Sequence, residues 1–160
     1  MPGLARARML ALVVPALLLG GAYVSQYWGG LAPCEMCWWQ RYGHMAAIPL
    51  ALFAFFTRRH RGASAMLTML AAVGILSSGV IGLFHAGVEY GWWEGFTTCS
   101  TMPAGGSGAD ILSQIMAAPI TRCDVAPWSF AGISLAGYNG LLSTGAALAI
   151  FMLLRKRNMR

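Results

Sequence analysis

The sequence predicts an all-α membrane protein, a four-transmembrane-helix bundle formed by residues 1–160 as a single domain, with two outer cysteine loops and a short interfacial helix. Of the 160 residues, 58% are hydrophobic and only 10% are charged, and the mean hydropathy is +0.61. Soluble domains usually carry about 25% charged residues, so this composition excludes an ordinary cytosolic globule. Four apolar stretches also reach the roughly 20 residues that cross the hydrocarbon core of a bilayer.

The first predicted span covers about residues 9–27, and its Pro15 is tolerated where neighbouring helices cover a kink. Three further spans are predicted at about 37–56, 64–84 and 132–154. An alternative for the N-terminal segment is a cleavable signal peptide, because a basic start precedes an apolar middle. The apolar run is long and lacks a clear A-x-A site, which favours a span.

Basic and acidic residues fall on opposite sides of these spans. Basic residues precede the first span, separate the second from the third and follow the fourth (Arg6, Arg8, Arg58, Arg59, Arg61, Arg155, Lys156, Arg157, Arg160), whereas all acids lie on the other side (Glu35, Glu89, Glu94, Asp110, Asp124). Basic residues in short loops mark the cytoplasmic face. We therefore expect both termini in the cytoplasm and outer loops at about 29–36 and 86–131. The net charge of +6 is then explained by this orientation in a lipid bilayer, and we expect no nucleic acid partner.

The long outer loop is not uniformly polar. Its Trp92, Trp93, Phe96 and Trp128 are candidates for anchors at headgroup level. Between a glycine run and Pro119, the stretch 110–118 places its apolar residues on one helical face, with Asp110 as the predicted N-cap. This pattern predicts a short helix that lies on the membrane surface.

All four cysteines lie in the predicted outer loops, Cys34 and Cys37 in the first and Cys99 and Cys123 in the second. The outer compartment of a bacterial inner membrane is oxidising, so disulfide chemistry is the first interpretation. A bridge within C-x-x-C closes too small a loop to constrain the unfolded chain much, and such pairs are typical of redox-active sites. Purely structural bridges remain an alternative. A zinc site is a third interpretation, but the other two cysteines do not form a second C-x-x-C, and we predict no metal.

Three further residues are candidates for a site at this end of the bundle. Arg41 follows Cys37 by one helical turn and shares its face, so it could favour a thiolate at Cys37 and bind a carbonyl oxygen of a lipid-soluble acceptor. The alternative is that Arg41 reaches out to the lipid headgroups. His85, at the outer end of the third span, is a second candidate because ionisable groups at membrane depth are commonly functional. His44, one turn beyond Arg41, is a weaker one.

The segment Pro33-Cys34-Glu35-Met36-Cys37-Trp38-Trp39-Gln40-Arg41 resembles the P-C-x-x-C-x-x-[EQ]-R pattern of the disulfide bond formation protein B (DsbB) family. Further matches are His85-Ala86-Gly87-Val88-Glu89, Trp92-Trp93-Glu94-Gly95 ahead of Cys99, and Cys123 followed by Trp128 and Gly132-Ile133-Ser134. The resemblance covers most of the chain. The spacing from the histidine to Cys99 varies in that family, so His85 matches less firmly than the first motif.

The resemblance implies an enzyme of the bacterial inner membrane that reoxidises a periplasmic thiol oxidase of the DsbA type and passes the electrons to ubiquinone or menaquinone. It implies that Cys99 forms the mixed disulfide with the partner and that Cys123, once released, can attack Cys34. Cys37 is then left as a thiolate facing the quinone, with Arg41 and His85 as cofactor-binding residues. Two rivals remain: a non-enzymatic scaffold with two structural disulfides, and a vitamin K epoxide reductase-like enzyme, although that family carries its C-x-x-C late in the bundle.

Overall fold

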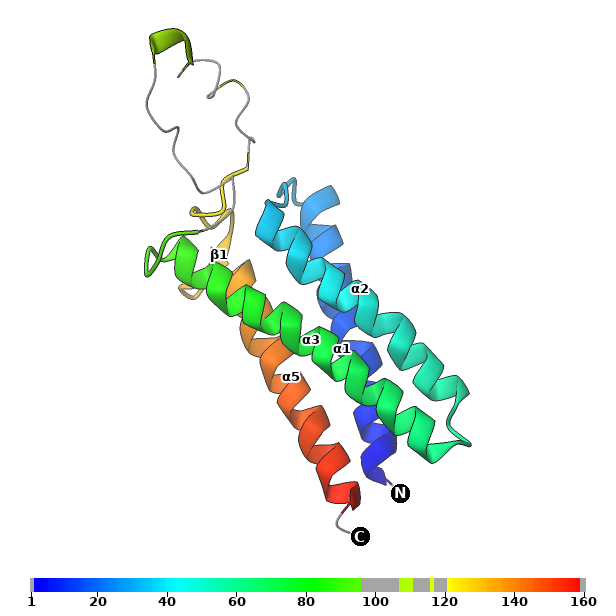
Figure 1. The fold of residues 1–160 in the computed structure, drawn as a ribbon. Coiled ribbons are helices and arrows are strands. Elements are labelled where there is room, and N and C mark those ends of the chain that lie inside the picture. Colours follow the sequence, from blue (N-terminus) through cyan, green and yellow to red (C-terminus); the bar gives the residue numbers. More distant parts are fainter. Residues whose placement is uncertain (1, 96–106, 111–115, 117–120, 159–160) are drawn as a thin grey trace.

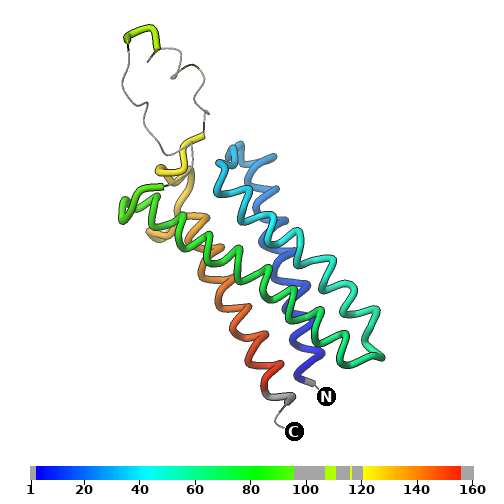
Figure 2. Tube along the Cα trace, viewed as in Figure 1, coloured from blue at the N-terminus to red at the C-terminus, as the bar shows by residue number. Residues whose placement is uncertain are grey.

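The computed structural model describes residues 2–95, 107–110, 116 and 121–158, and four long helices dominate them (Figure 1). The elements in chain order are α1 (Pro2–Tyr27), α2 (Glu35–Phe56), α3 (Arg61–Glu89), β1 (Ser129–Phe130), β2 (Ile133–Ser134) and α5 (Leu135–Asn158). The helices run side by side, and α1 contacts α2 and α5 while α3 contacts the same two helices (Figure 2). Both chain ends lie at the end of the bundle that also holds the α2–α3 turn.

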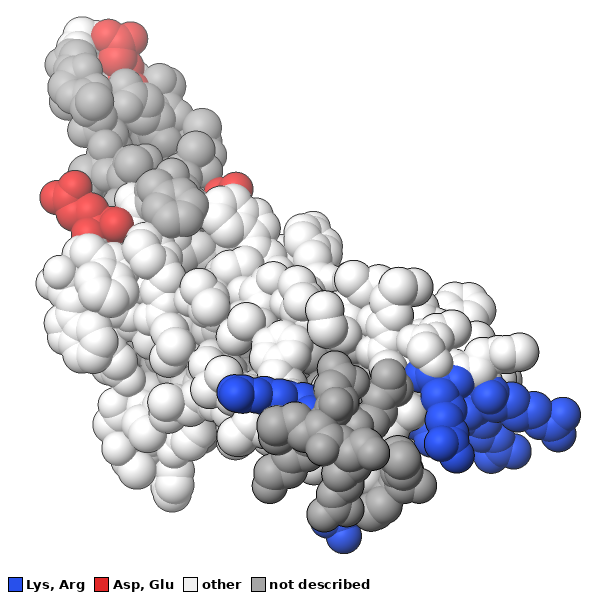
Figure 3. Space-filling model, turned by 60° about the horizontal axis from the view of Figure 1, so that its bottom comes forward, with Lys and Arg blue, Asp and Glu red and all other residues white. Residues whose placement is uncertain are grey.

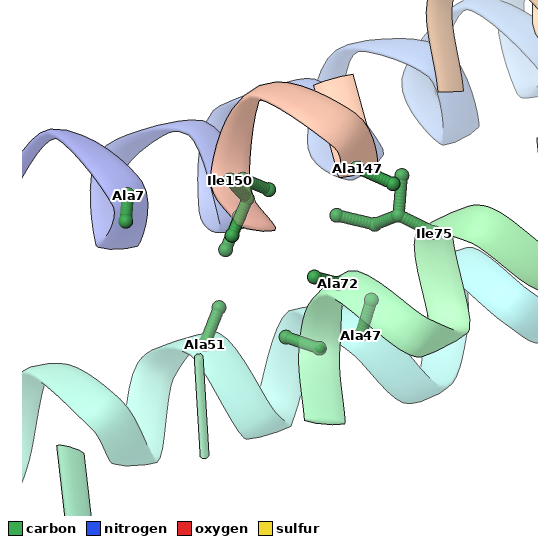
Figure 4. Packing of buried hydrophobic residues seen from close by; sticks show 9 residues of the cluster. Ala7, Ala47, Ala51, Ala72, Ile75, Ala147 and Ile150 are labelled. Carbon is green, nitrogen blue, oxygen red and sulfur yellow. The ribbon is translucent and has the colours of Figure 1, made fainter. Parts of the chain in front are cut away.

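Small residues fill the centre of the bundle. Seven alanines from all four helices surround Ile75 and Ile150 in one buried cluster (Figure 4). Small side chains let helix backbones approach closely, which is the usual packing solution between membrane helices. The approach is close where α2 crosses α3, because a Cβ on Gly43 would lie 2.7 Å from the carbonyl oxygen of Gly74.

Three of the described helices are long and apolar enough to cross a membrane: Gly3–Tyr27, Arg61–Glu89 and Leu135–Arg155. The predicted second span, which is α2, does not reach that hydropathy. Its first half carries Gln40, Arg41 and His44, all of them buried in the bundle. The count of four spans therefore stays a prediction.

Two helices differ from the predicted spans at the ends near the cysteine loops. The third helix continues past residue 84 to Glu89, so His85 lies one turn before its end. The fourth helix begins at Leu135, because residues 129–134 form an unpredicted hairpin whose turn residues Ala131 and Gly132 have φ of 50° and 78°. Two consecutive positive φ values are typical of the tight turns that match the twist of paired strands.

The short surface helix is described only at residues 108–110 and 116, which are helical, and the rest of the stretch 110–118 lies outside the described residues. Its predicted cap is wrong. The Ser107 hydroxyl accepts from the Asp110 amide at 3.4 Å, and the Asp110 carboxylate accepts from the Ser107 amide at 3.1 Å. Ser107 is thus the N-cap and Asp110 stands three residues into the helix, as in a capping box.

The two ends of the bundle differ in charge. In Figure 3 the lysines and arginines gather at one end of the molecule and the acidic residues at the other. The charge separation predicted along the sequence is thus also a separation in space. Residues of α1 also line the cavity described below, so cleavage of a signal peptide would remove one wall of it.

Candidate functional site

The two cysteines of the C-x-x-C motif meet where α2 begins. Cys34 is the N-cap residue of α2, with extended backbone angles, and Cys37 lies in the first turn. Both are free cysteines, and their Sγ atoms are 3.3 Å apart. Cys34 is only 4% exposed, whereas Cys37 is half-buried. The helix start thus presents a dithiol at the end of the bundle opposite the chain termini.

A cysteine of the second loop packs against this dithiol. Cys123 is disulfide-bonded and fully buried, and it shares a hydrophobic cluster with Cys34, Met36 and Val88. Cys99, the fourth predicted site residue, lies outside the described residues. The structure therefore brings three of the four predicted cysteines together, although 86 positions separate Cys37 from Cys123.

His85 bridges the dithiol and the bundle interior, and its tautomer follows from its neighbours. Gln40 Nε2 lies 3.1 Å from the carbonyl oxygen of Met36, which can only accept, so this atom is the amide nitrogen, a donor. The same nitrogen lies 3.0 Å from His85 Nδ1 and donates to it as well. Nδ1 is therefore the acceptor, and in the neutral ring Nε2 carries the hydrogen. Nε2 lies 3.5 Å from Cys34 Sγ and 3.8 Å from Glu89 Oε1, so His85 donates toward the Cys34 sulfur.

This arrangement makes Cys34 the more acidic thiol. Its hydrogen bond with Cys37 and, to a lesser degree, the His85 ring lower the pKa of the Cys34 thiol well below its usual range, against the opposing effect of burial. From the sequence alone, the stabilised thiolate was expected at Cys37 beside Arg41. The structure differs because the polar contact to the pair comes from His85, which touches Cys34, while the Arg41 side chain turns to another helix.

Arg41 is 6% exposed and is held against α1. Its guanidinium donates to the side-chain oxygen of Gln26 and, at 3.2 Å, to the carbonyl oxygen of Ala22. It also lies 5.0 Å from the ring centroids of both Tyr23 and Trp38. Four contacts fix the side chain inside the bundle, whereas an arginine that reaches for headgroups would be free at its tip.

A cavity of about 230 Å³ opens between α1, α2 and α5. Its walls are mostly apolar, and α1 contributes Leu17, Leu18 and Ala22. The side chains with polar groups on the lining come largely from α2 and α5: Ser25, Cys37, Gln40, Arg41, His44, Glu89, Tyr138 and Asn139. An apolar chamber with a few polar groups is the usual form of a small-molecule site. Cys37, rather than Cys34, is the thiol that faces it.

Gln40, Asn139 and Glu89, which have no predicted role, also line this cavity. Asn139 donates to Gln40 Oε1 at 2.8 Å and accepts from His44 Nε2 at 2.9 Å, which links the two histidines through two amides. A signal was present in the sequence. Gln40 and His44 are four residues apart in one apolar helix, as are Asn139 and Ser143 in another, and such pairs share a face.

The geometry also bears on the zinc interpretation. The ligand atoms of Cys34, Cys37 and His85 lie within 4.8 Å of one another. A closed structural zinc site needs four ligands. Within the described residues, the remaining nearby sulfur belongs to Cys123, which is disulfide-bonded and so is not a thiolate. The donor set fits a redox dithiol better than a zinc site.

Comparison with known proteins agrees with this chemistry. The sequence profile of the family described as disulfide bond formation protein DsbB matches residues 5–153. The chain is 29% identical over 147 residues to the uncharacterized protein RP370 of Rickettsia prowazekii, covering 90% of this chain and 83% of that protein. It is 28% identical over 167 residues to disulfide bond formation protein B of Marinobacter nauticus, covering 94% and 92%.

No solved structure matches the chain significantly. The profile match spans α1, α2, α3, the hairpin and most of α5, and so includes the dithiol, His85 and the cavity. Together with three helices able to cross a bilayer, it makes the protein a multi-pass membrane protein concerned with disulfide bond formation. The chain belongs to the DsbB family of disulfide bond formation proteins.

Proposed function

We propose that the protein is a quinone-dependent thiol–disulfide oxidoreductase that reoxidises a periplasmic DsbA-type thiol oxidase and passes the electrons to ubiquinone or menaquinone. One observation carries the proposal: the two sulfurs of the dithiol face different neighbours. Cys34 shares a buried cluster with Cys123 of the second loop, and Cys37, which packs at the edge of that cluster, is the one that lines the apolar cavity. A dithiol in this position can take electrons from the cysteine pair of the second loop and pass them to an apolar molecule in the cavity.

The thiol half of the reaction runs through the second loop. A thiolate of the reduced partner attacks Cys99, and the bond between Cys99 and Cys123 breaks with release of the Cys123 thiolate. The partner's second thiolate then displaces Cys99 and leaves the partner oxidised. Cys123 attacks Cys34 in the Cys34–Cys37 disulfide, and Cys99 closes the bond to Cys123 again. Two electrons now reside on the first pair as free Cys34 and Cys37.

The quinone half returns the first pair to its disulfide. Two electrons and two protons leave Cys34 and Cys37 as the S–S bond forms, and a bound quinone supplies the acceptor for both. The cavity fits such a molecule, since its walls are apolar and His44, one of the lining residues, has a buried ring nitrogen, Nδ1, with no hydrogen-bond partner among the described residues. Arg41 and Cys37 are the lining residues with the chemistry to hold a ring oxygen and to deliver electrons.

The proposed topology has four spans, with α2 as the second, in a bacterial inner membrane. Both termini and the basic α2–α3 turn are cytoplasmic, and the cysteine loops are periplasmic. The separation of basic and acidic ends supports this orientation, because basic residues in short loops stay on the cytoplasmic side. The polar first half of α2 faces the cavity and the other helices, as polar groups at membrane depth generally do.

The test is anaerobic quinone reduction by the purified protein, started with a reduced DsbA-type protein. We expect Cys37→Ser to abolish quinone reduction, while Cys99 still forms the mixed disulfide with the partner. Full quinone turnover by that variant would contradict the assigned roles. A scaffold with two structural disulfides would instead retain stable bridges and reduce no quinone.

A further inference from the structure

We infer that His44 binds the reduced form of the quinone, by accepting a hydrogen bond from a quinol hydroxyl at its Nδ1 atom. This inference rests on the proposed function and adds a residue that distinguishes the product from the substrate. It concerns the deeper end of the cavity, one helical turn beyond Arg41, where α2 packs against α3 and α5.

The hydrogen-bond network fixes which nitrogen of His44 carries the hydrogen. Asn139 Nδ2 lies 3.3 Å from the carbonyl oxygen of Ser78, which can only accept, so the amide nitrogen points there. The amide oxygen of Asn139 must then be the atom 2.9 Å from His44 Nε2. Since that oxygen can only accept as well, Nε2 is the donor. A neutral His44 consequently has its lone pair on Nδ1.

That lone pair has no hydrogen-bond partner among the described residues, although His44 is only 3% exposed. A buried acceptor without a partner costs about 1–3 kcal/mol, so such atoms are usually paired or functional. The polar groups packed around the ring all engage Nε2, namely Asn139, Ser78 at 3.0 Å and Ser143 at 3.4 Å. Nδ1 itself is almost fully covered, but His44 is one of the residues that line the cavity, so a molecule in the cavity that reaches the edge of the ring can become the partner of Nδ1.

The chemistry of Nδ1 selects the reduced ligand. A quinone carbonyl oxygen can only accept, and two acceptors placed together repel each other. A quinol carries hydroxyl groups and can donate. His44 lies about 4.5 Å further along α2 than Arg41, at a rise of about 1.5 Å per residue. This offset is comparable to the separation of the two oxygens across a quinone ring, so Arg41 can hold one oxygen while His44 accepts from the other.

Two variants separate this binding role from a structural one. In His44→Asn the side-chain oxygen can take the position of Nδ1, but the bond to Asn139 is lost. In His44→Gln the amide can take the position of Nε2 and keep the bond to Asn139, but the acceptor at Nδ1 is lost. The proposal predicts that His44→Asn retains the preference for quinol and that His44→Gln loses it. A purely structural role predicts the opposite ranking.

The experiment measures equilibrium binding of a short-chain quinone and of its quinol to the full chain in nanodiscs, under anaerobic conditions. A Cys37→Ser background prevents electron exchange with the ligand, and mixed-disulfide formation at Cys99 by a reduced DsbA-type protein reports that each variant is folded. We expect His44→Gln to weaken quinol binding roughly tenfold, the effect of one lost hydrogen bond, and to change quinone binding by less than about twofold.

Equal losses for quinone and quinol, or a weaker His44→Asn than His44→Gln, would overturn the inference. If the chain with His44 intact binds neither form, the proposed function itself fails and the inference with it. A measurement without substitution complements the variants. When histidine is labelled with the heavy nitrogen isotope, the nitrogen magnetic resonance of His44 Nδ1 should shift on addition of quinol more than on addition of quinone, and an unchanged resonance would also overturn the inference.

Discussion

Replacing Gln40 by leucine tests how the site controls the acidity of Cys34 without touching either cysteine. Gln40 donates to His85 Nδ1, and this bond keeps the hydrogen on Nε2, which points at the Cys34 sulfur. In Gln40→Leu the imidazole is free to carry its hydrogen on Nδ1 instead. Cys34 then loses a donor, and the pKa of its thiol should rise.

The size of the rise follows from the contact. A hydrogen bond to a charged group contributes about 1.5–3 kcal/mol, and one pKa unit corresponds to about 1.36 kcal/mol. The Nε2–Sγ distance of 3.5 Å is long, so the low end applies and we expect an increase of about one unit. The hydrogen bond with Cys37 remains, and the pKa of Cys34 should therefore stay below that of an ordinary cysteine.

The assay is a pH titration of the ultraviolet thiolate absorbance of the chain with its first pair reduced, with Cys34→Ser as the blank. Because the pKa of Cys34 is lowered, the thiolate should persist below the usual thiol range of about 8.5 and disappear only on the acid side of neutrality. Gln40→Glu is the matched control. Its carboxylate accepts a hydrogen bond from Nδ1 and favours a charged His85 ring, in which Nε2 still carries a hydrogen and still donates to Cys34. A Gln40→Leu variant with an unchanged titration, or a Gln40→Glu variant whose Cys34 pKa rises as much as in Gln40→Leu, would contradict this role of His85.

Two further predictions concern the cavity and the bundle. In steady-state assays, Arg41→Ala should raise the KM for quinone about tenfold or more and change the KM for the thiol partner much less. Arg41→Lys should not restore the KM for quinone, because lysine cannot keep both hydrogen bonds to α1. Equal effects on the two KM values would remove Arg41 from the quinone site. Gly140→Ala should destabilise the bundle by about 1–3 kcal/mol in detergent unfolding, because the new Cβ would lie 2.8 Å from the Leu83 backbone nitrogen. The control is Gly145→Ala, whose Cβ meets nothing within 4 Å and which should be neutral or stabilising. Similar unfolding curves for the two variants would contradict the packing described.

The ends of the first two helices were predictable because turn-forming residues follow each apolar run, two glycines at 29 and 30 and a basic segment after residue 57. The predicted ends of the first two spans, residues 27 and 56, coincide with the ends of α1 and α2. The end of α3 was not predictable, since the stretch after residue 84 loses its apolar character but stays helical to Glu89. The hairpin was missed because strands of two residues leave no alternating pattern to detect.

The candidate site was predictable at the level of residue types. Cysteine spacing and helix faces identified Cys34, Cys37 and Arg41, but not the direction in which each side chain points. Whether Arg41 reaches its neighbouring thiol or α1, and whether His85 donates to Cys34, depends on which helices pack together. The link between the histidines likewise needs Gln40 of α2 beside Asn139 of α5, 99 residues apart, a contact that only the bundle creates.

The most direct test of the account follows the electrons within the chain alone. The Cys34–Cys37 pair is reduced, mixed anaerobically with a short-chain quinone, and quenched with a mass-labelled thiol reagent while quinone absorbance is recorded. If Cys34 and Cys37 deliver the electrons, one quinone is lost for each pair of thiols, Cys34 and Cys37 disappear together as free thiols, and the disulfide of Cys123 stays intact. Bound quinone that remains oxidised beside two free thiols would contradict it.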